Sequence, residues 1–241
     1  VDPAGFAAQR ELFVQGEFDA GQRCQTRRIV ERGVGAGNRA ELGFIQIRRP
    51  AQHLGAVLGR GGPRLGQSQR GIDIGGSGMK AAIVDLTTGE LVSKRHRIST
   101  PRPATPAAMV DVVKQLVDGH QWSAPLGVAF PSIVHHGIVG LAANIDRSWM
   151  GVDADALFTQ ACGLDVTMIN DADAAGIAEV RFGAGRDRAG VVIMLTFGTG
   201  IGSGMFIDGR LVPNTELGHL ELDGHDAETR ASAVVREREG L

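Results

Sequence analysis

From residue 71 onward, the spacing of hydrophobic and polar positions predicts regular strands and helices. Helices are expected over residues 105–117, 153–162 and 171–182. Short apolar runs bounded by turn residues predict strands over residues 71–74, 81–86, 91–98, 126–130, 138–140, 166–169, 191–196, 201–207 and 210–212. The first three of these strands are joined by short turns and should form a meander. Strands that alternate with helices predict an α/β protein with mixed sheets.

Two glycine-rich turns each follow a predicted strand, in the segments GIDIGGSGMK (71–80) and LTFGTGIGSG (195–204). Glycine lets the backbone double back without a side chain, so that N–H groups can face an anion. The polar segment NDADAAG (170–176) follows another strand between them. One glycine turn is a weak signal, but two of them around an Asn-Asp pair indicate phosphoryl transfer to a hydroxyl group.

Residues 1 to 70 differ from the rest of the chain in charge. They contain eleven Arg, no Lys and six acidic residues, for +5, whereas the remainder contains 14 basic and 21 acidic residues, for −7. The first part lacks sustained periodicity except over 42–47. We interpret residues 1–69 as a linker, a disordered leader or residues ahead of the native start, and a basic arm for nucleic acid is the alternative.

Composition excludes several classes of protein. The chain of 241 residues is 43% hydrophobic, so it can bury a core, and it contains no apolar run of eighteen residues. No secretory signal is recognisable, and the two cysteines, Cys24 and Cys162, cannot form a disulfide framework. We therefore expect a soluble cytoplasmic protein.

Several motifs together resemble the ROK family of sugar kinases and repressors, within the actin and hexokinase superfamily. Besides the two glycine turns and NDADAAG, AANIDRSW (142–149) and ELGHLE (216–221) occur in the family's order. The resemblance spans residues 71–241 and implies a ribonuclease-H-like α/β fold, with mixed sheets and flanking helices in two lobes, 70–140 and 141–241. The family's C-terminal part has no counterpart before Leu241, so we expect the second lobe to be incomplete there.

The resemblance implies that both glycine turns bind the phosphates of a donor. The residues concerned are Gly75, Gly76, Ser77, Gly78 and Lys80 in the first turn, and Gly198, Thr199 and Gly200 in the second. Asp73, at the end of the first strand, would hold a hydrated Mg²⁺, which prefers one or two carboxylates. Plain hairpin turns and a turn aspartate are the structural alternatives.

Asp171 is the candidate general base. It follows an apolar strand and opens a predicted helix, so a rigid element would project it toward the substrate. In the family pattern the matching aspartate accepts the proton of the sugar hydroxyl. Helix capping is the structural alternative, because an Asn-Asp pair caps well.

Sugar recognition requires several polar groups, because each buried hydroxyl left unsatisfied costs free energy. The resemblance assigns Asn144, Glu216 and His219 to the sugar, together with Asp171. Glu228 is a further candidate with Glu221 as its rival. We expect these distant segments to converge on one crevice.

One departure from the wider family concerns zinc. Most ROK proteins bind zinc through a cysteine cluster after the Gly-His pair, whereas this chain has no cysteine after Cys162, so we expect no zinc. The polyphosphate-using glucokinases of the family share this departure.

We therefore predict a Mg²⁺-dependent glucokinase of carbohydrate metabolism (glycolysis). It would transfer a phosphoryl group from polyphosphate or ATP to the 6-hydroxyl of glucose, giving glucose 6-phosphate. The expected partners are glucose and the polyphosphate or nucleotide donor, with no membrane or nucleic acid, and a homodimer is left open. The alternatives are an ATP-dependent ROK hexokinase for another sugar and a sugar-responsive repressor. A repressor should carry a helix-turn-helix, which residues 1 to 70 do not show.

Overall fold

A computed structural model describes residues 68–119, 122, 124–141, 145–198, 200–232, 235 and 238–239, together with strands β1 (Arg10–Phe13), β2 (Arg28–Val30) and β3 (Leu42–Ile47). The chain divides into two compact units, one of residues Arg49–Ala178 and one of Val1–Arg48 with Glu179–Leu241, which are treated separately below. The expected leader over residues 1–69 lies mostly outside the described residues. The expected lobes, 70–140 and 141–241, stay a prediction.

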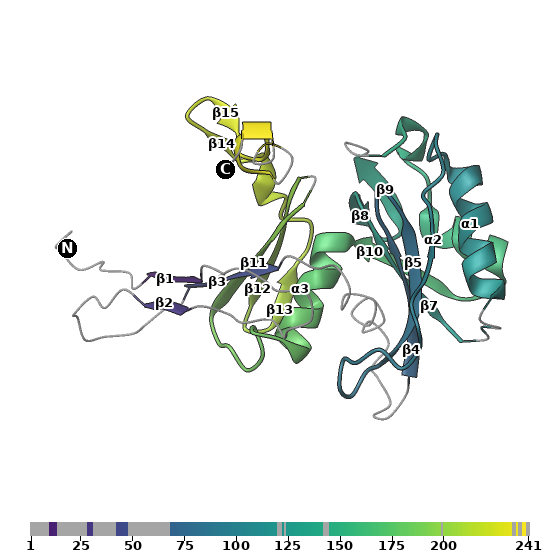
Figure 1. The fold of residues 1–241 in the computed structure, drawn as a ribbon, viewed down its shortest axis with the longest axis horizontal. Coiled ribbons are helices and arrows are strands. Elements are labelled where there is room, and N and C mark those ends of the chain that lie inside the picture. The colour runs from purple at the N-terminus through teal and green to yellow at the C-terminus, as the bar shows by residue number, and fades with distance from the viewer. Residues whose placement is uncertain are drawn as a thin grey trace. The chain divides into compact units, whose positions relative to one another are not determined.

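The unit of residues Arg49–Ala178 is built on a five-stranded mixed sheet (Figure 1). Its strand order is β10 (Val166–Asn170), β7 (Leu126–Phe130), β4 (Ser68–Ile74), β5 (Met79–Asp85), β6 (His96–Ile98). β4, β5 and β6 pair antiparallel, which confirms the predicted meander, whereas β4, β7 and β10 run parallel. The carboxyl ends of these three parallel strands therefore share one edge of the sheet.

Two helices, α1 (Pro106–Asp118) and α2 (Ala154–Cys162), cover one face of this sheet (Figure 1). Each begins where the sequence predicts, because Thr105 and Asp153 cap the first turns by accepting hydrogen bonds from backbone N–H groups. The apolar side of α1 is buried in the core, and the side chain of Met109 is fully covered. These caps and this stripe of apolar residues fix the position of both helices.

Trp149 anchors the same core. The residue is fully buried at the end of the short 3-10 helix η2 (Arg147–Trp149), and its ring centroid lies 4.9 Å from that of Phe130 and 5.9 Å from that of Phe158. Its Nε1–H donates to the carbonyl oxygen of Ala104 at 2.9 Å. A small hairpin of β8 (Ile133–His135) and β9 (Ile138–Leu141) precedes η2.

The other unit contains a six-stranded sheet of order β13 (Arg210–Val212), β12 (Ile201–Ile207), β11 (Val191–Phe197), β3, β1, β2. β11 and β12 pair antiparallel on either side of the second glycine turn. A 3-10 helix η3 (Leu217–His219), a hairpin of β14 (Glu221–Leu222) and β15 (His225–Asp226), and a short helix α4 (Glu228–Ala231) follow. Helix α3 (Asp171–Phe182) has the bounds that the sequence predicts and crosses the division between the units.

The prediction of one strand over residues 91–98 is wrong. Only His96–Ile98 forms a strand, and Leu91 forms an isolated bridge. The reason is local. The Ser93 hydroxyl accepts a 2.9 Å hydrogen bond from the Ile83 N–H, which takes the place of a backbone partner in the ladder. Across the part of the chain that the structure describes, no helix has the length and apolar character that crossing a membrane requires.

Candidate active site

Asp73 and Lys80 face each other across the first glycine turn. The antiparallel register of β4 and β5 places them opposite one another, and Lys80 Nζ donates to Asp73 Oδ2 at 3.0 Å. Asp73 is only 6% exposed. Burial raises the pKa of its carboxyl group, and the charge of Lys80 opposes that rise. In this arrangement the lysine, predicted to contact phosphate, compensates the buried carboxylate.

Hydrogen bonds hold the backbone of the first glycine turn, whereas the tip of the turn is exposed. The Gly75 N–H donates to the Gly78 carbonyl at 3.2 Å, while Thr100 Oγ1 donates to the carbonyl of Gly75 and Arg97 donates to that of Ser77 at 2.7 Å. Gly76 and Ser77 are exposed, and a Cβ added at Gly76 would meet no atom within 4 Å. The tip of the turn therefore has room for an anion to approach the backbone.

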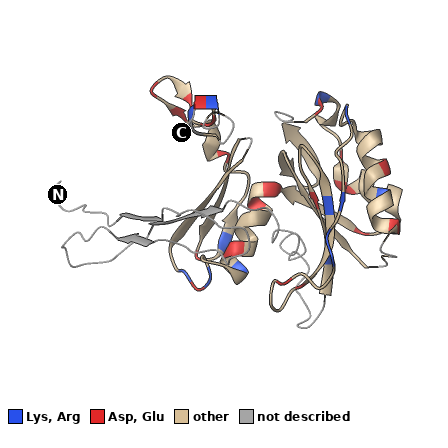
Figure 2. Ribbon diagram, viewed as in Figure 1, with Lys and Arg blue, Asp and Glu red and all other residues tan. Residues whose placement is uncertain are grey.

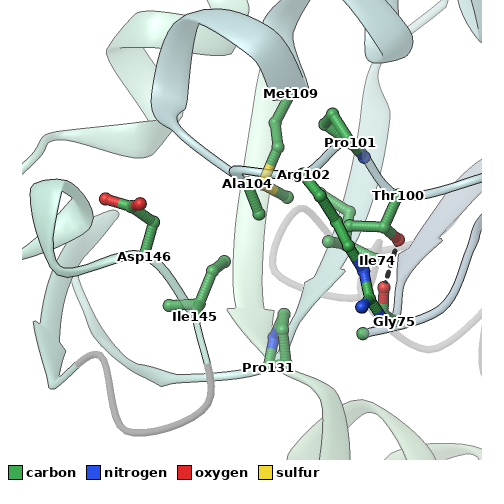
Figure 3. A pocket seen from close by; sticks show the side chains of 11 residues that line it. Ile74, Gly75, Thr100, Pro101, Arg102, Ala104, Met109, Pro131, Ile145 and Asp146 are labelled. Carbon is green, nitrogen blue, oxygen red and sulfur yellow. Dashed lines mark hydrogen bonds between the residues drawn. The ribbon is translucent and has the colours of Figure 1, made fainter.

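A pocket of about 430 Å³ opens beside this turn (Figure 3). Its wall combines apolar residues with polar groups contributed by Thr100, Arg102 and Asp146. The Arg102 side chain extends along the pocket toward Gly75 (Figure 3). The lining residues are Ile74, Gly75, Gly76, Thr100, Pro101, Arg102, Ala104, Met109, Pro131, Ile145 and Asp146. A cation beside a turn of glycine backbone suits an anionic ligand.

The same unit holds the predicted base. Asn170 ends β10 and caps α3, because its Oδ1 accepts a 3.0 Å hydrogen bond from the Asp173 N–H while its Nδ2 donates to the Ser132 carbonyl. Asp171 is the first residue of the helix and is half-buried. Its Oδ1 accepts a hydrogen bond from the Ala172 N–H at 2.8 Å. Asn144, the predicted sugar ligand, lies outside the described residues.

The second glycine turn belongs to the other unit. The Gly198 N–H donates to the Gly200 carbonyl at 2.9 Å, and Thr199 lies outside the described residues. Glu228 closes this turn from one side, because its Oε2 accepts a 2.8 Å hydrogen bond from the Ile201 N–H. A Cβ on Gly200 would collide with that carboxylate. A predicted phosphate turn and a predicted sugar ligand are thus in direct contact.

Three predicted sugar ligands, Glu216, His219 and Glu228, lie close enough to interact electrostatically. Burial raises the pKa of Glu216, and the nearby Glu228 raises it further, whereas His219 opposes the rise. His219 Nδ1 lies 2.9 Å from Asp226 Oδ2, and this hydrogen bond raises the pKa of the imidazole. Glu221, the rival of Glu228, is exposed on β14. Figure 2 shows acidic positions along this hairpin and the short helix after it.

Close packing fixes the loop that contains these residues. The Leu217 N–H donates to Ser203 Oγ at 2.8 Å, which ties η3 to β12. A Cβ added to Gly218 would collide with the carbonyl oxygen of Ile201, so only glycine fits there. Glu216 adopts a left-handed backbone, with φ of 35°. The side chains of Glu216 and His219 are therefore displayed from a backbone that has little freedom.

Sequence reasoning missed two residues of these groups, Arg102 and Asp226. Arg102 follows a strand in a proline-rich segment, and nothing in its spacing marks it. Asp226 had a usable signal, because Asp223 and Gly224 form the two-residue turn typical of a hairpin, with φ of 53° and 75°. That hairpin brings Asp226 back toward His219.

The chain belongs to the ROK family, which it matches over residues 69–233. It is 52% identical over 169 residues to the polyphosphate glucokinase of Mycobacterium tuberculosis, which covers 70% of this chain and 64% of that protein. The chain therefore spans somewhat less than two thirds of the length of this relative.

Two solved structures share the fold. The inorganic polyphosphate/ATP-glucomannokinase from Arthrobacter sp. strain KM is 54% identical, with a TM-score of 0.69 over 72% of each chain. A ROK family glucokinase from Streptomyces griseus, in complex with glucose and AMPPNP, is 31% identical, with a TM-score of 0.63 over 71% of this chain and 59% of that one. The predicted fold class, an actin- and hexokinase-like α/β fold with mixed sheets and flanking helices, is confirmed.

Proposed function

We propose that this protein transfers a phosphoryl group from inorganic polyphosphate or ATP to the 6-hydroxyl of glucose, giving glucose 6-phosphate. The observation that carries the proposal is the hydrogen bond from the Ile201 N–H to Glu228, which joins a glycine turn suited to phosphate to the polar cluster of Glu216 and His219. The likeness to the polyphosphate glucokinase of M. tuberculosis supports the choice of donor and sugar.

The groups of this chain have separate tasks in the proposed reaction. Asp171 accepts the proton of the sugar hydroxyl, or orients that hydroxyl, from the first turn of a capped helix. Backbone N–H groups of each glycine turn are suited to stabilise negative charge on the phosphates of the donor. Glu216, His219 and Glu228 bind hydroxyl groups of the sugar, with Asn144 and Asp171.

Mg²⁺ fits the chemistry of Asp73. The residue offers a single buried carboxylate beside an open glycine turn, which agrees with an ion that keeps most of its waters. When bound, the cation would neutralise negative charge on the donor phosphates. The same carboxylate forms an ion pair with Lys80. With glucose and polyphosphate as partners, the protein would act in the cytoplasm.

The test is glucose 6-phosphate formation by the full chain, measured in parallel with polyphosphate and ATP and with a panel of other hexoses. We expect product with glucose and at least one of the two donors, dependent on added Mg²⁺. Glucose binding measured by calorimetry gives a second readout that needs no turnover. Absence of both binding and product would overturn the proposal, and turnover of another hexose alone would favour a different sugar kinase.

A further inference from the structure

Asp226 links two short helical segments of its unit. Its Oδ2 lies 2.9 Å from His219 Nδ1 at the end of η3, and its Oδ1 accepts a 2.9 Å hydrogen bond from the Glu228 N–H at the start of α4. Its backbone carbonyl accepts a further hydrogen bond from Thr229 Oγ1 at 2.7 Å. Both carboxylate oxygens are therefore engaged, each with a different predicted sugar ligand.

The backbone places Asp226 without help from a ligand. β14 and β15 pair antiparallel, so that Glu221 lies opposite Asp226. The turn between them consists of Asp223 and Gly224, which both have positive φ as a tight hairpin requires. The Ala227 N–H donates to the Leu220 carbonyl at 2.9 Å and closes the base of the hairpin. The carboxylate is thus directed at His219 by the fold itself.

This contact determines which ring nitrogen of His219 is available. An ionised carboxylate only accepts hydrogen bonds, so the proton of the shared contact is on Nδ1. Nε2 is then the nitrogen that can meet a ligand. The hydrogen bond to Asp226 raises the pKa of His219, burial opposes the rise, and Glu228 and Glu216 add to it. The imidazole therefore stays protonated to higher pH. Its Nε2 donates a hydrogen bond when the ring is protonated and accepts one when the ring is neutral.

We propose that Asp226 is a positioning residue for sugar binding, which orients His219 so that its Nε2 forms a hydrogen bond with a sugar hydroxyl. The proposal rests on the sugar-binding role of His219 in the proposed function. A continuous path of contacts runs from His219 through Asp226 to Glu228, and from the Glu228 carboxylate to the Ile201 N–H at 2.8 Å. Asp226 therefore also connects the sugar-binding histidine to the second glycine turn.

The test compares Asp226→Asn with Asp226→Glu, His219→Gln and the double variant D226N/H219Q in the full chain. Asparagine keeps the size and an oxygen acceptor of Asp226 but removes the charge. Asp223→Asn is the matched control, because it makes the same change at an exposed position of the same hairpin, where asparagine suits the positive φ. Glucose affinity is measured by calorimetry, and the protonation of the His219 ring by NMR as a function of pH.

We expect Asp226→Asn to weaken glucose binding by about 5- to 10-fold, because a hydrogen bond to a charged acceptor is stronger than one to a neutral acceptor. The pKa of His219 should fall toward its ordinary value in this variant, while Asp223→Asn leaves both properties unchanged. Asp226→Glu should restore part of the affinity. The double variant should bind glucose no more weakly than His219→Gln alone, because Asp226 acts through the histidine.

Two results would overturn this inference while leaving the proposed function in place. One is wild-type glucose affinity in Asp226→Asn alongside a loss in His219→Gln. The other is a loss of glucose-binding free energy in the double variant that equals the sum of the losses in the two single variants. Asp226 would then act independently of His219. Wild-type affinity in His219→Gln would instead overturn the proposed sugar role of the histidine, and the inference with it.

Discussion

Asn170 caps helix α3 through the N–H of Asp173, with a hydrogen bond of 3.0 Å from that N–H to Asn170 Oδ1. The sequence left open whether Asp171, the next residue, serves as a cap or as a base. The structure assigns the cap to Asn170, so Asp171 is not required to start the helix. The capping alternative for Asp171 therefore loses its support, and its role as a base stays a prediction.

Asp171→Asn should lower turnover by about 100-fold or more, because a positioned general base typically contributes about 10²- to 10⁴-fold. The thermal unfolding midpoint should change little, since the Asn side chain can still accept the hydrogen bond from the Ala172 N–H. Asn170→Ala is the matched control and should cost about 1 kcal/mol of stability through loss of the cap. Near-native turnover in Asp171→Asn would remove this residue from the mechanism.

Asp73→Asn should leave the protein at least as stable at neutral pH while Mg²⁺-dependent activity is lost. Burial raises the pKa of Asp73 in the folded state above its ordinary value of 3.8, so the folded state binds more protons between these two pKa values. The stability contributed by Asp73 is therefore present at low pH and falls as pH rises through that interval. The thermal unfolding midpoint of Asp73→Asn should therefore rise relative to that of the wild type as pH increases through this interval.

Lys80→Gln is the control for the Asp73 prediction. It removes the ammonium group that lies 3.0 Å from Asp73 Oδ2 and compensates the charge of that buried carboxylate. The variant should therefore be less stable than the wild type at neutral pH. A variant Asp73→Asn that unfolds at markedly lower temperature than the wild type at pH 7 would show that the ion pair outweighs the cost of burying the charge.

Gly218→Ala should destabilise the protein by about 1–3 kcal/mol, as overpacking typically does. The added Cβ would collide with the backbone carbonyl of Ile201. A backbone atom cannot move away as the end of a flexible side chain can. Gly198→Ala in the same unit is the control, because a Cβ added at Gly198 would meet no atom within 4 Å. Denaturant unfolding of both variants measures the difference, and equal stabilities would contradict the close packing of η3 on β12.

Arg102→Gln should raise the KM for polyphosphate by about tenfold with a smaller change in kcat, because a hydrogen bond from a charged group to a phosphate is lost. The dependence of this KM on salt should also become weaker. Arg210→Gln, at an exposed position of β13, is the control for a general loss of positive charge. An unchanged KM and salt dependence in Arg102→Gln would exclude the pocket beside Gly75 from donor binding.

The helices were predictable because their signals are local. Thr105 and Asp153 cap α1 and α2 at the first residues that the sequence indicates, and β7 has the bounds of its apolar run. The extent of β6 was not predictable, because it depends on the Ser93 hydroxyl, which takes the N–H of Ile83 ten residues earlier. A side chain that replaces a backbone partner leaves no trace in the hydrophobic period.

The site shows the same contrast. Individual motifs identified Glu216, His219 and Glu228, and the structure brings these three together in one unit. The motifs could not show that Asp226 orients the histidine, because that contact depends on the path of a hairpin. Trp149, the last residue of the motif AANIDRSW, could pack in the core or against a sugar ring. Its full burial between Phe130 and Phe158 decides for the core.

The position of the tryptophans has a practical consequence. The chain contains two, Trp122 and Trp149, and no tyrosine, and both tryptophans belong to the unit of residues Arg49–Ala178. Intrinsic fluorescence excited at the indole band therefore originates in that unit alone. An unfolding curve recorded by emission would follow only half of the molecule, whereas circular dichroism would follow both halves. Two separated transitions by these two probes would reveal that the halves melt independently.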